Sequence, residues 1–588
     1  MALALVAVTL FALAVRLYDL GGRVFHWDEG RVGYWTLRYA ETGEFAYAPI
    51  IHGPFLRIVN ASVFGVLPPT DATARLVVAL VGGLLPLSAW LFRRHLDRAE
   101  VVALGGFLAF TPLLVYYSRF MRNDVLVGAF AFVALGFAVR SLDTRRVWYL
   151  YPAAFFLALS LTTKANTLLY VLCFAGASTL VADHRFLRDV RASGSPRAAL
   201  ASWWRRLRTG GREAAGDWPP LAALAVHLLG LTVVFLGVIV FFYAPRPMLY
   251  QSLGSPGMWS AVVHEATVGS ARELVDLWIA GDMQEGNPYF EFLRHELETL
   301  SYGAAVVCVF ALVGFVVDGY GTTADADQDA GSDSESGGGE RVGAPAGRNR
   351  AFVAFAAYWA LASLVGYPAA TDINAPWSAV HIAIPLTIPA AVGVVYVVRE
   401  GLAAWGAADR ETAVLAALVL LVATGGLFAP TATYWNSADP DQTEVVQWSQ
   451  PHNDLRESLD DAEAAIAAHD GDPDNPDILF VGSEVRDGAF YVSDESVADD
   501  KGATGGWYDR LPLPWYYERA GGEVTSIPAD ADRAAELVDA PPVVVAHAED
   551  RETVDPHLDG YVAREHQLRL WDFPVVIYVE ESALEDVE

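Results

Sequence analysis

Two adjacent carboxylates, Asp28 and Glu29, follow the first apolar run of the chain within the segment HWDEG. Adjacent carboxylates beside a membrane can supply a general base together with a group that positions it, or a ligand for a divalent metal. The pair could instead be solvated, or could cap a helix that begins near Gly30. We take Asp28 and Glu29 as candidate catalytic residues.

A second charged cluster lies between two apolar runs, in the segment YYSRFMRND at 116–124. Arg119, Arg122 and Asp124 fall at a depth where charge is costly unless it is paired or used. Arginine can hold a phosphate through two parallel hydrogen bonds, and Asp124 could orient these groups or bind a metal. The alternative is an internal ion pair whose arginine stems lie along the membrane interface.

Two further segments carry candidates for binding a lipid-linked phosphate. Lys164 lies in LTTKAN, and the chain has one other lysine, Lys501. Its flexible point charge suits a phosphate, although anchoring at the membrane surface would also explain it. Trp377 and His381 lie in DINAPWSAVHIAIPL, where they could equally be an aromatic-belt residue and a hydrogen-bonded helix histidine.

Several common site motifs are missing from the sequence. It has no P-loop, no dinucleotide-binding glycine fingerprint and no HExxH, so nothing supports nucleotide hydrolysis or zinc proteolysis. The predicted outer surface is acidic, which argues against a nucleic-acid partner.

These candidates must be positioned by two units of different composition. Residues 431–588 hold 37 of the 70 acids and 9 of the 40 bases, which leaves the first 430 residues almost neutral. We predict a helical membrane domain over 1–430 and an acidic extracytoplasmic α/β domain over 431–588. Acid-rich, lysine-poor surfaces are typical of salt-loving archaea, so the acidity is better explained by solubility than by a basic partner.

Eleven apolar runs approach membrane-spanning length. They are 2–18, 73–92, 100–117, 124–140, 147–163, 166–182, 220–243, 300–318, 351–369, 379–398 and 412–430. Arginine-rich loops, above all 183–217, then fall on one side, which predicts a cytoplasmic amino terminus and an external tail. We read the first run as a retained helix. The segment 321–349 is predicted to be a disordered cytoplasmic linker.

Outside the membrane, the loop 19–72 shows the apolar spacing of helices that lie at a membrane surface. The tail alternates predicted strands with helices. The strands are expected at 478–482, 523–527, 543–548 and 575–580, and the helices at 453–468 and 530–539.

The four clusters together resemble the GT-C superfamily of integral membrane glycosyltransferases, which includes protein O-mannosyltransferases and lipid A aminoarabinose transferases. With LPLPWYYER at 511–519, the chain most closely resembles an archaeal GT-C-like family associated with flippase activity in protein N-glycosylation. The resemblance implies that Asp28 is the catalytic base, with Glu29 beside it, and that Asp124 is the second acidic residue. It implies that Arg119, Arg122 and Lys164 hold the donor phosphate.

The expected function is transfer of a sugar from dolichyl phosphate at the outer face, in archaeal surface protein glycosylation. The expected partners are a polyprenyl- or dolichyl-phosphate sugar, membrane lipid and other proteins of the glycosylation pathway. A divalent metal at Asp28 and Asp124 is an open alternative. Two rival functions are a non-catalytic protein that assists flipping of the dolichyl-phosphate sugar and, with less support, a solute transporter.

Overall fold

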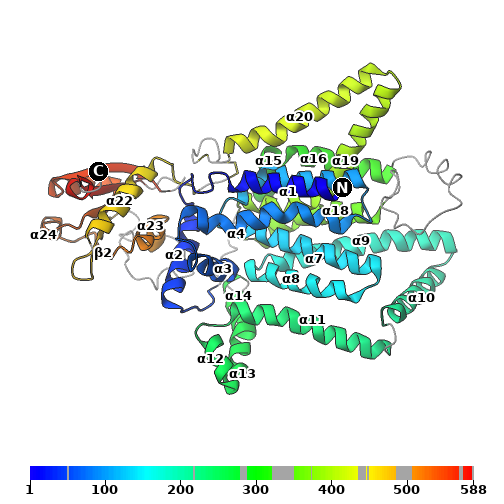
Figure 1. The fold of residues 1–588 in the computed structure, drawn as a ribbon, viewed down its shortest axis with the longest axis horizontal. Helices are drawn as coiled ribbons and strands as arrows, with labels where there is room; N and C mark the ends of the chain where they lie inside the picture. Colours follow the sequence, from blue (N-terminus) through cyan, green and yellow to red (C-terminus); the bar gives the residue numbers. More distant parts are fainter. Residues whose placement is uncertain are drawn as a thin grey trace.

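The computed structural model is an elongated helical bundle with a small α/β domain at one end (Figure 1). It describes residues 1–48, 52–215, 219–278, 288–320, 350–371, 374–434, 437, 445–446, 449–469, 471–484, 506–568 and 574–585. The predicted linker at 321–349 lies outside these residues. The predicted combination of a polytopic helical membrane protein with a C-terminal α/β domain is confirmed.

Seven helices in the described residues are long and apolar enough to cross a membrane, or eight if one bent pair counts as a span. The seven are α4 with the short helix after it (Asp71–Phe92), α7 (Asp124–Thr144), α9 (Thr167–Ser193), α11 (Pro220–Tyr243), α18 (Ala351–Ala370), α19 with the turn before it (Pro376–Gly406) and α20 (Arg410–Tyr434). The bent pair is α15 (Tyr289–Gly303) and α16 (Ala305–Tyr320), at 97°.

The other predicted spans fall on shorter helices. These are α1 (Ala2–Leu17), α5 (Arg98–Phe110) followed by α6 (Pro112–Tyr117), and α8 (Leu150–Thr163). The expected span at 100–117 is divided at Thr111 because Pro112 has no backbone N–H to continue the helix. All eleven predicted runs therefore coincide with a helix or a helix pair. Within the described part of the chain, only seven, or eight with the bent pair, are long and apolar enough to cross a membrane.

Other helices lie at the two ends of the bundle. The loop 19–72 forms α2 (Trp27–Thr42) and α3 (Phe55–Phe64), as its apolar spacing predicts. At the same end lie α12 (Met248–Gly254), α13 (Trp259–His264) and α14 (Ser270–Trp278) (Figure 1). At the opposite end, α10 (Pro196–Ala215) connects α9 with the region of α11 (Figure 1).

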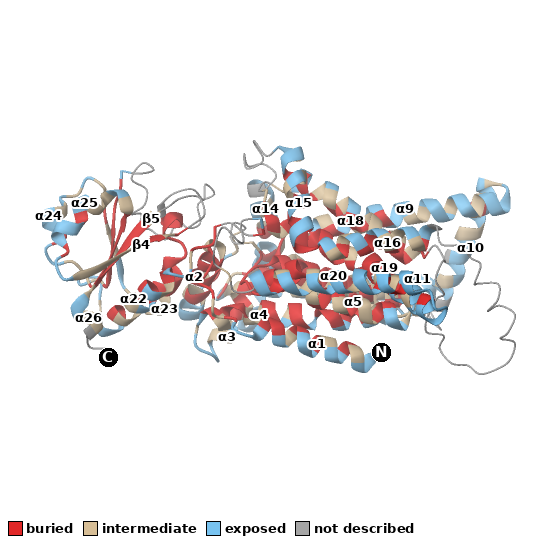
Figure 2. Cartoon of the chain, turned by 90° about the horizontal axis from the view of Figure 1, so that it is seen from above, coloured by how far each residue is buried: buried red, intermediate tan, exposed pale blue. Residues whose placement is uncertain are grey.

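The C-terminal domain is built on a five-stranded sheet of order β2-β1-β3-β5-β4. The strands are β1 (Ile478–Val481), β2 (Val524–Ile527), β3 (Val543–His547), β4 (Tyr561–Gln567) and β5 (Pro574–Glu580). The first three run parallel and β5 pairs antiparallel with β3 and β4. The helices α22 (Leu455–His469), α23 (Leu513–Arg519), α24 (Arg533–Glu536), α25 (Arg551–Val554) and α26 (Glu581–Glu585) complete the domain. Buried residues concentrate in the sheet and in the bundle centre (Figure 2).

Four of the five strands lie where they were predicted, and β4 was missed. Its sequence YVAREHQ places four polar residues in succession, so its hydrophobic alternation is weak. It is an edge strand, where charged side chains such as Arg564 are tolerated. Arg564 pairs with Asp461 of α22 at 2.6 Å, which explains one of these charges.

Candidate carboxylate and phosphate site

Asp28 and Arg122 form the centre of the candidate site. Asp28 lies in the first turn of α2, and its Oδ2 accepts a short hydrogen bond from Arg122 Nη1. Arg122 Nε also lies 3.4 Å from Asp124 Oδ2. The guanidinium carbon of Arg122 stands 3.7 Å from the ring centre of Trp377, a cation–π contact. One arginine thus joins two carboxylates that are distant in sequence.

Asp124 connects Arg122 to two further groups of the site. Its Oδ1 accepts a hydrogen bond of 3.0 Å from Lys164 Nζ and lies 3.6 Å from His381 Nε2. The other ring nitrogen of His381 is 2.8 Å from the hydroxyl of Tyr170. Five of the predicted site residues therefore join in one network with Asp28. They are Arg122, Asp124, Lys164, Trp377 and His381.

The network forms because several spans begin or end at the same rim of the bundle. Asp124 is the first residue of α7, Lys164 follows the end of α8, and His381 lies in the first turn of α19. The outer loop contacts this rim through Gly53, whose N–H donates a hydrogen bond of 2.9 Å to the carbonyl of Thr163 at the end of α8. A Cβ at Gly53 would lie 2.1 Å from the carbonyl oxygen of Thr162, so only glycine fits there.

A small internal space of about 10 Å³ lies beside Asp28. It is lined by Asp28, Arg31, Val32, His52, Met121, Arg122 and Asn123. That volume holds roughly one water molecule. Among the described residues, Arg122 Nη2 and both polar side-chain atoms of Asn123 have no hydrogen-bond partner although they are buried. Buried polar atoms of this kind are costly unless a ligand or water satisfies them, so we take this space as the candidate binding position.

Opposing effects set the charge state of the groups around this space. Burial raises the pKa of Asp28, but the Arg122 guanidinium outweighs it and the pKa falls to about 2. Burial lowers the pKa of His52 to about 3, and the nearby Lys164 ammonium acts in the same direction. At neutral pH the site therefore contains an ionised Asp28 and a neutral His52.

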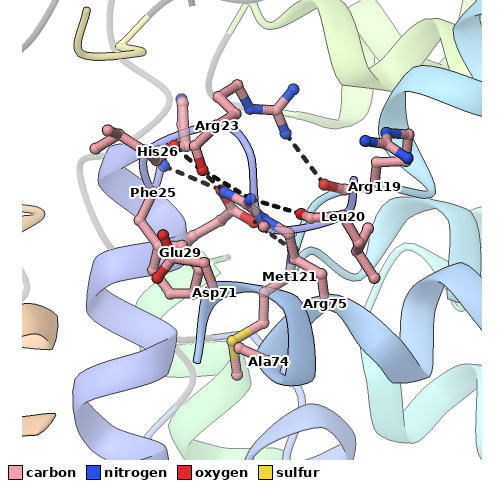
Figure 3. Close-up of polar contacts among 12 residues, drawn as sticks. Leu20, Arg23, Phe25, His26, Glu29, Asp71, Ala74, Arg75, Arg119 and Met121 are labelled. Carbon is pink, nitrogen blue, oxygen red and sulfur yellow. Dashed lines mark hydrogen bonds and ion pairs between the residues drawn. The ribbon is translucent and has the colours of Figure 1, made fainter. Parts of the chain in front are cut away.

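Glu29 is not among the residues that line this space, and Arg75 holds its carboxylate (Figure 3). Arg75 Nε and Nη2 donate to the two carboxylate oxygens of Glu29 at 2.7 and 2.8 Å. The same carboxylate accepts hydrogen bonds from the backbone N–H groups of Met121, at 2.7 Å, and His26, at 3.0 Å. Burial raises the pKa of Glu29, but the charge of Arg75 lowers it further, so the carboxylate stays ionised. Glu29 caps α2 and connects it to α4 and to the segment that carries Arg122.

Arg119 also lies outside the network of Asp28. Its Nη1 donates to the carbonyls of Val15, Arg16 and Tyr18, and its Nη2 to that of Asp19. Val15 and Arg16 belong to the last turn of α1, where carbonyl groups have no partner within the helix, and Tyr18 and Asp19 follow its end. Arg119 therefore fixes the end of α1 against the segment 118–123, three residues from Arg122.

The C-terminal domain holds α2 from the other side. A Cβ at Gly30 would lie 2.7 Å from Pro512, and one at Gly33 would lie 2.6 Å from the ring of Trp515. These glycines let the LPLPWYYER segment approach the helix that carries Asp28. Trp27 Nε1 adds a hydrogen bond of 2.9 Å to the carbonyl of Tyr508.

Asp71, the first residue of α4, joins the two domains. Its buried carboxylate accepts hydrogen bonds from Trp515, Tyr516, Arg519 and Arg456, at 2.9, 3.0, 3.0 and 2.7 Å. One turn further along α4, Arg75 binds Glu29. A continuous series of contacts thus runs from the C-terminal domain through α4 to α2.

His52, Asn123 and Tyr170 were not predicted as site residues. Asn123 directly precedes Asp124 and was covered only as part of the segment 116–124. His52 and Tyr170 gave no signal by spacing, because Lys164, whose charge acts on His52, and His381, which contacts Tyr170, lie more than 100 positions away. The sequence feature that could have pointed to His52 was the segment HGPF, in which a glycine and a proline predict a turn in the outer loop.

The arrangement also bears on a metal at Asp28 and Asp124. The Arg122 guanidinium contacts both carboxylates and supplies the positive charge between them. No group of three or more histidine, cysteine or acidic side chains with metal-binding geometry occurs in the described residues. As they stand, Asp28 and Asp124 fit an arginine bridge and not a shared metal.

Comparison with known proteins gives matches to two family models. Residues 50–195 match the dolichyl-phosphate-mannose-protein mannosyltransferase model, and residues 455–580 match the Agl23 flippase-associated protein C-terminal domain. A comparison with curated protein sequences gives no significant match.

Solved structures share the architecture at low sequence identity. ArnT from Cupriavidus metallidurans in the apo state is 15% identical, with 98% of each chain covered and a TM-score of 0.52. The same protein bound to undecaprenyl phosphate gives 15%, 98% and 0.51. The Archaeoglobus fulgidus oligosaccharyltransferase in the apo form is 13% identical over 97% of this chain and 74% of its own, with a TM-score of 0.46.

These matches confirm the predicted resemblance in both of its parts. The fold of ArnT extends over nearly the whole chain, and the two family models cover the end of the first outer loop with the following spans to residue 195, and the tail. The chain therefore has the fold of ArnT, with residues 50–195 similar to dolichyl-phosphate-mannose-protein mannosyltransferases and residues 455–580 similar to the Agl23 flippase-associated protein C-terminal domain.

Proposed function

We propose that the chain transfers a sugar from dolichyl phosphate, or a related polyprenyl phosphate, to an acceptor at the outer face of an archaeal membrane. The observation that carries the proposal is that Asp28, Arg122 and Lys164 meet at one rim of the bundle, next to a buried space with unsatisfied donors. Support for the lipid carrier comes from the mannosyltransferase match and from ArnT, which binds undecaprenyl phosphate. The arginine-rich loops support the outward orientation.

The reaction is a single displacement at the anomeric carbon. The acceptor oxygen forms a bond to this carbon while the bond from carbon to phosphate oxygen breaks. Asp28 takes the acceptor proton, and the bonding electrons leave with the lipid phosphate. Arg122 and Lys164 stabilise the charge that develops on that phosphate.

Arg122 would link donor binding to the strength of the base. In the present state it neutralises Asp28 and holds the pKa of this carboxyl at about 2, where it is a weak base. A donor phosphate competes for the same guanidinium through charge-assisted hydrogen bonds. As Arg122 turns towards the phosphate, the pKa of Asp28 rises and the carboxylate becomes a stronger base.

The test is to assay full-length protein in liposomes with a dolichyl-phosphate sugar and to compare Asp28→Asn with Glu41→Gln. Glu41 lies at the other end of α2 with 55% of its side chain exposed, so it is a matched control for loss of one charge. We expect Asp28→Asn to lower the transfer rate at least 100-fold and Glu41→Gln to leave it unchanged. Wild-type transfer by a stably inserted Asp28→Asn protein would refute the assignment of the base.

A second candidate function is assistance in moving the carrier lipid between leaflets. It is supported by the flippase-associated domain at 455–580 and by the neutralised state of Asp28. In a host that lacks the gene, charged dolichyl phosphate would accumulate in the inner leaflet if translocation were lost. It would accumulate in the outer leaflet if transfer were lost.

A further inference from the structure

A large cavity lies at the end of the bundle opposite α2 and the C-terminal domain. Its volume is about 1280 Å³, and its walls come from α7, α8, α9, α10 and α18, with one residue each from the region of His95 and from α11. Figures 1 and 2 place α10 and the end of α9 at this extremity, far from α2, which carries Asp28. The cavity is therefore separate from the candidate transfer site.

The inner part of the cavity is apolar and as long as one membrane leaflet. Along α9 its lining begins at Val171 and stays largely apolar to Ala182, with Ser178 as the polar exception. At 1.5 Å per residue, this stretch measures about 16 Å. The hydrocarbon core of a bilayer is about 30 Å thick, so one leaflet supplies about 15 Å. Leu157 and Phe355 continue the apolar wall on the neighbouring helices.

The mouth of the cavity is basic. Arg185 and Arg188 follow on the next turns of α9, and Arg206 faces them from α10. Arg206 lies 3.5 Å from Asp189, which also accepts a hydrogen bond of 2.7 Å from Trp203. In the part of the chain that the structure describes, Arg185 and Arg188 have no acidic partner.

The remaining polar groups at the mouth are paired with each other. His95 Nε2 lies 2.8 Å from Asp143 Oδ1, and Arg140 Nη1 lies 3.4 Å from the other carboxylate oxygen. Both acidic side chains that line the cavity, Asp143 and Asp189, thus have basic partners. Two guanidinium groups are left over beside an apolar channel of leaflet length.

We propose that this cavity binds an anionic phospholipid of the cytoplasmic leaflet. One hydrocarbon chain fills the apolar channel, and Arg185 and Arg188 hold the phosphate of the headgroup. Basic pockets between membrane helices on the cytoplasmic side bind anionic lipids in this way. Exposed apolar side chains of α10, including Leu200 and Trp204, place this helix at the same membrane surface. The lipid would thereby bind α10 to the bundle.

Native mass spectrometry of the full-length protein from nanodiscs tests the proposal. The discs contain phosphatidylglycerol and phosphatidylcholine in equal amounts. We expect the wild-type protein to retain one phosphatidylglycerol, and the double variant Arg185→Gln/Arg188→Gln to retain roughly 10- to 30-fold less. Arg191→Gln/Arg197→Gln is the matched control, because it removes two exposed arginines of α9 and α10 that do not line the cavity.

A second variant tests the apolar channel separately. Ala138→Trp fills part of the channel without changing any charge, and should also reduce lipid retention. Equal retention of both phospholipids, or unchanged retention in the two cavity variants, would overturn the proposal. Stoichiometric displacement of phosphatidylglycerol by added dolichyl phosphate would also overturn it, because the cavity would then belong to the carrier lipid.

Discussion

Glu29 accepts two hydrogen bonds from Arg75, while its neighbour Asp28 accepts one from Arg122. Successive residues of a helix point about 100° apart, so the two carboxylates in the first turn of α2 reach different partners. Asp28 faces the candidate site and Glu29 faces α4. Under the proposed function, Asp28 would carry the chemistry and Glu29 would position α2.

Breaking the pair of Glu29 and Arg75 should destabilise the protein strongly. Arg75→Gln leaves a buried carboxylate without its cation, a change that typically costs about 3–5 kcal/mol. We expect a clear drop in the thermal unfolding temperature in detergent, and loss of transfer although Asp28 is intact.

Arg38→Gln is the control, since its contacts with Glu41 and Glu518 are partly exposed. The double variant Glu29→Gln/Arg75→Met removes both charges and should recover part of the stability. Equal unfolding temperatures for Arg75→Gln and Arg38→Gln would contradict this prediction.

Lys164 should control affinity for the donor more than stability. Lys164→Gln removes a cation that contacts Asp124 at 3.0 Å, and we expect the KM for the dolichyl-phosphate sugar to rise about 10-fold or more. Lys164→Arg keeps the charge and should restore part of the affinity. Titration of donor in the liposome assay measures this, and an unchanged KM in Lys164→Gln would separate Lys164 from the phosphate.

His52 should make unfolding depend on pH in the mildly acidic range. Its pKa is about 3 in the folded protein, against about 6.5 in an unfolded chain. The unfolded state therefore binds the proton first, and the contribution of His52 to stability is present above pH 6.5 and lost as the pH falls towards 3. We expect the unfolding temperature of His52→Asn to decline less steeply than that of the wild type between pH 6.5 and 4. Parallel curves would show that His52 takes up a proton freely in the folded protein.

Asp28 should contribute in a lower pH range. Its folded pKa of about 2 lies below the usual value of 3.8, so its contribution is complete above pH 4 and is lost as the pH falls through about 2. The lowered pKa corresponds to about 2 kcal/mol. The difference in unfolding free energy between the wild type and Asp28→Asn should stay constant from pH 7 to 5 and shrink below pH 4. A difference that already shrinks at pH 6 would mean that Arg122 does not hold the carboxylate.

Asp71 should determine whether the C-terminal domain holds α2. Asp71→Ala removes the acceptor for four donors from that domain. Hydrogen exchange should accelerate over residues 27–42, while the exchange of β3 within its own sheet should stay as in the wild type. Asp71→Asn can keep some of these hydrogen bonds and should give an intermediate result. Unchanged exchange in α2 would show that the contacts of Gly30 and Gly33 suffice.

The membrane fold and most of the network could be predicted because apolar runs and isolated charges are local signals. The apolar runs end near Asp124, Lys164 and His381. The arginine distribution of the loops then placed these three residues on the same side of the membrane. The different orientations of Arg119 and Arg122 could not be predicted, since the segment 118–123 is not part of a regular helix and has no periodicity to read. The pairing of Glu29 with Arg75 crosses 46 positions and depends on how α2 packs on α4.

The shared carboxylate of Asp71 restricts how this architecture can be recombined. A chimera that takes its tail from a relative would present foreign donors to Asp71 and a foreign surface to Gly30 and Gly33. Such a chimera should fold well only if residues 19–75 are exchanged together with the tail. The outer loop and the C-terminal domain should therefore be exchanged as one unit, although some 380 residues separate them in the sequence.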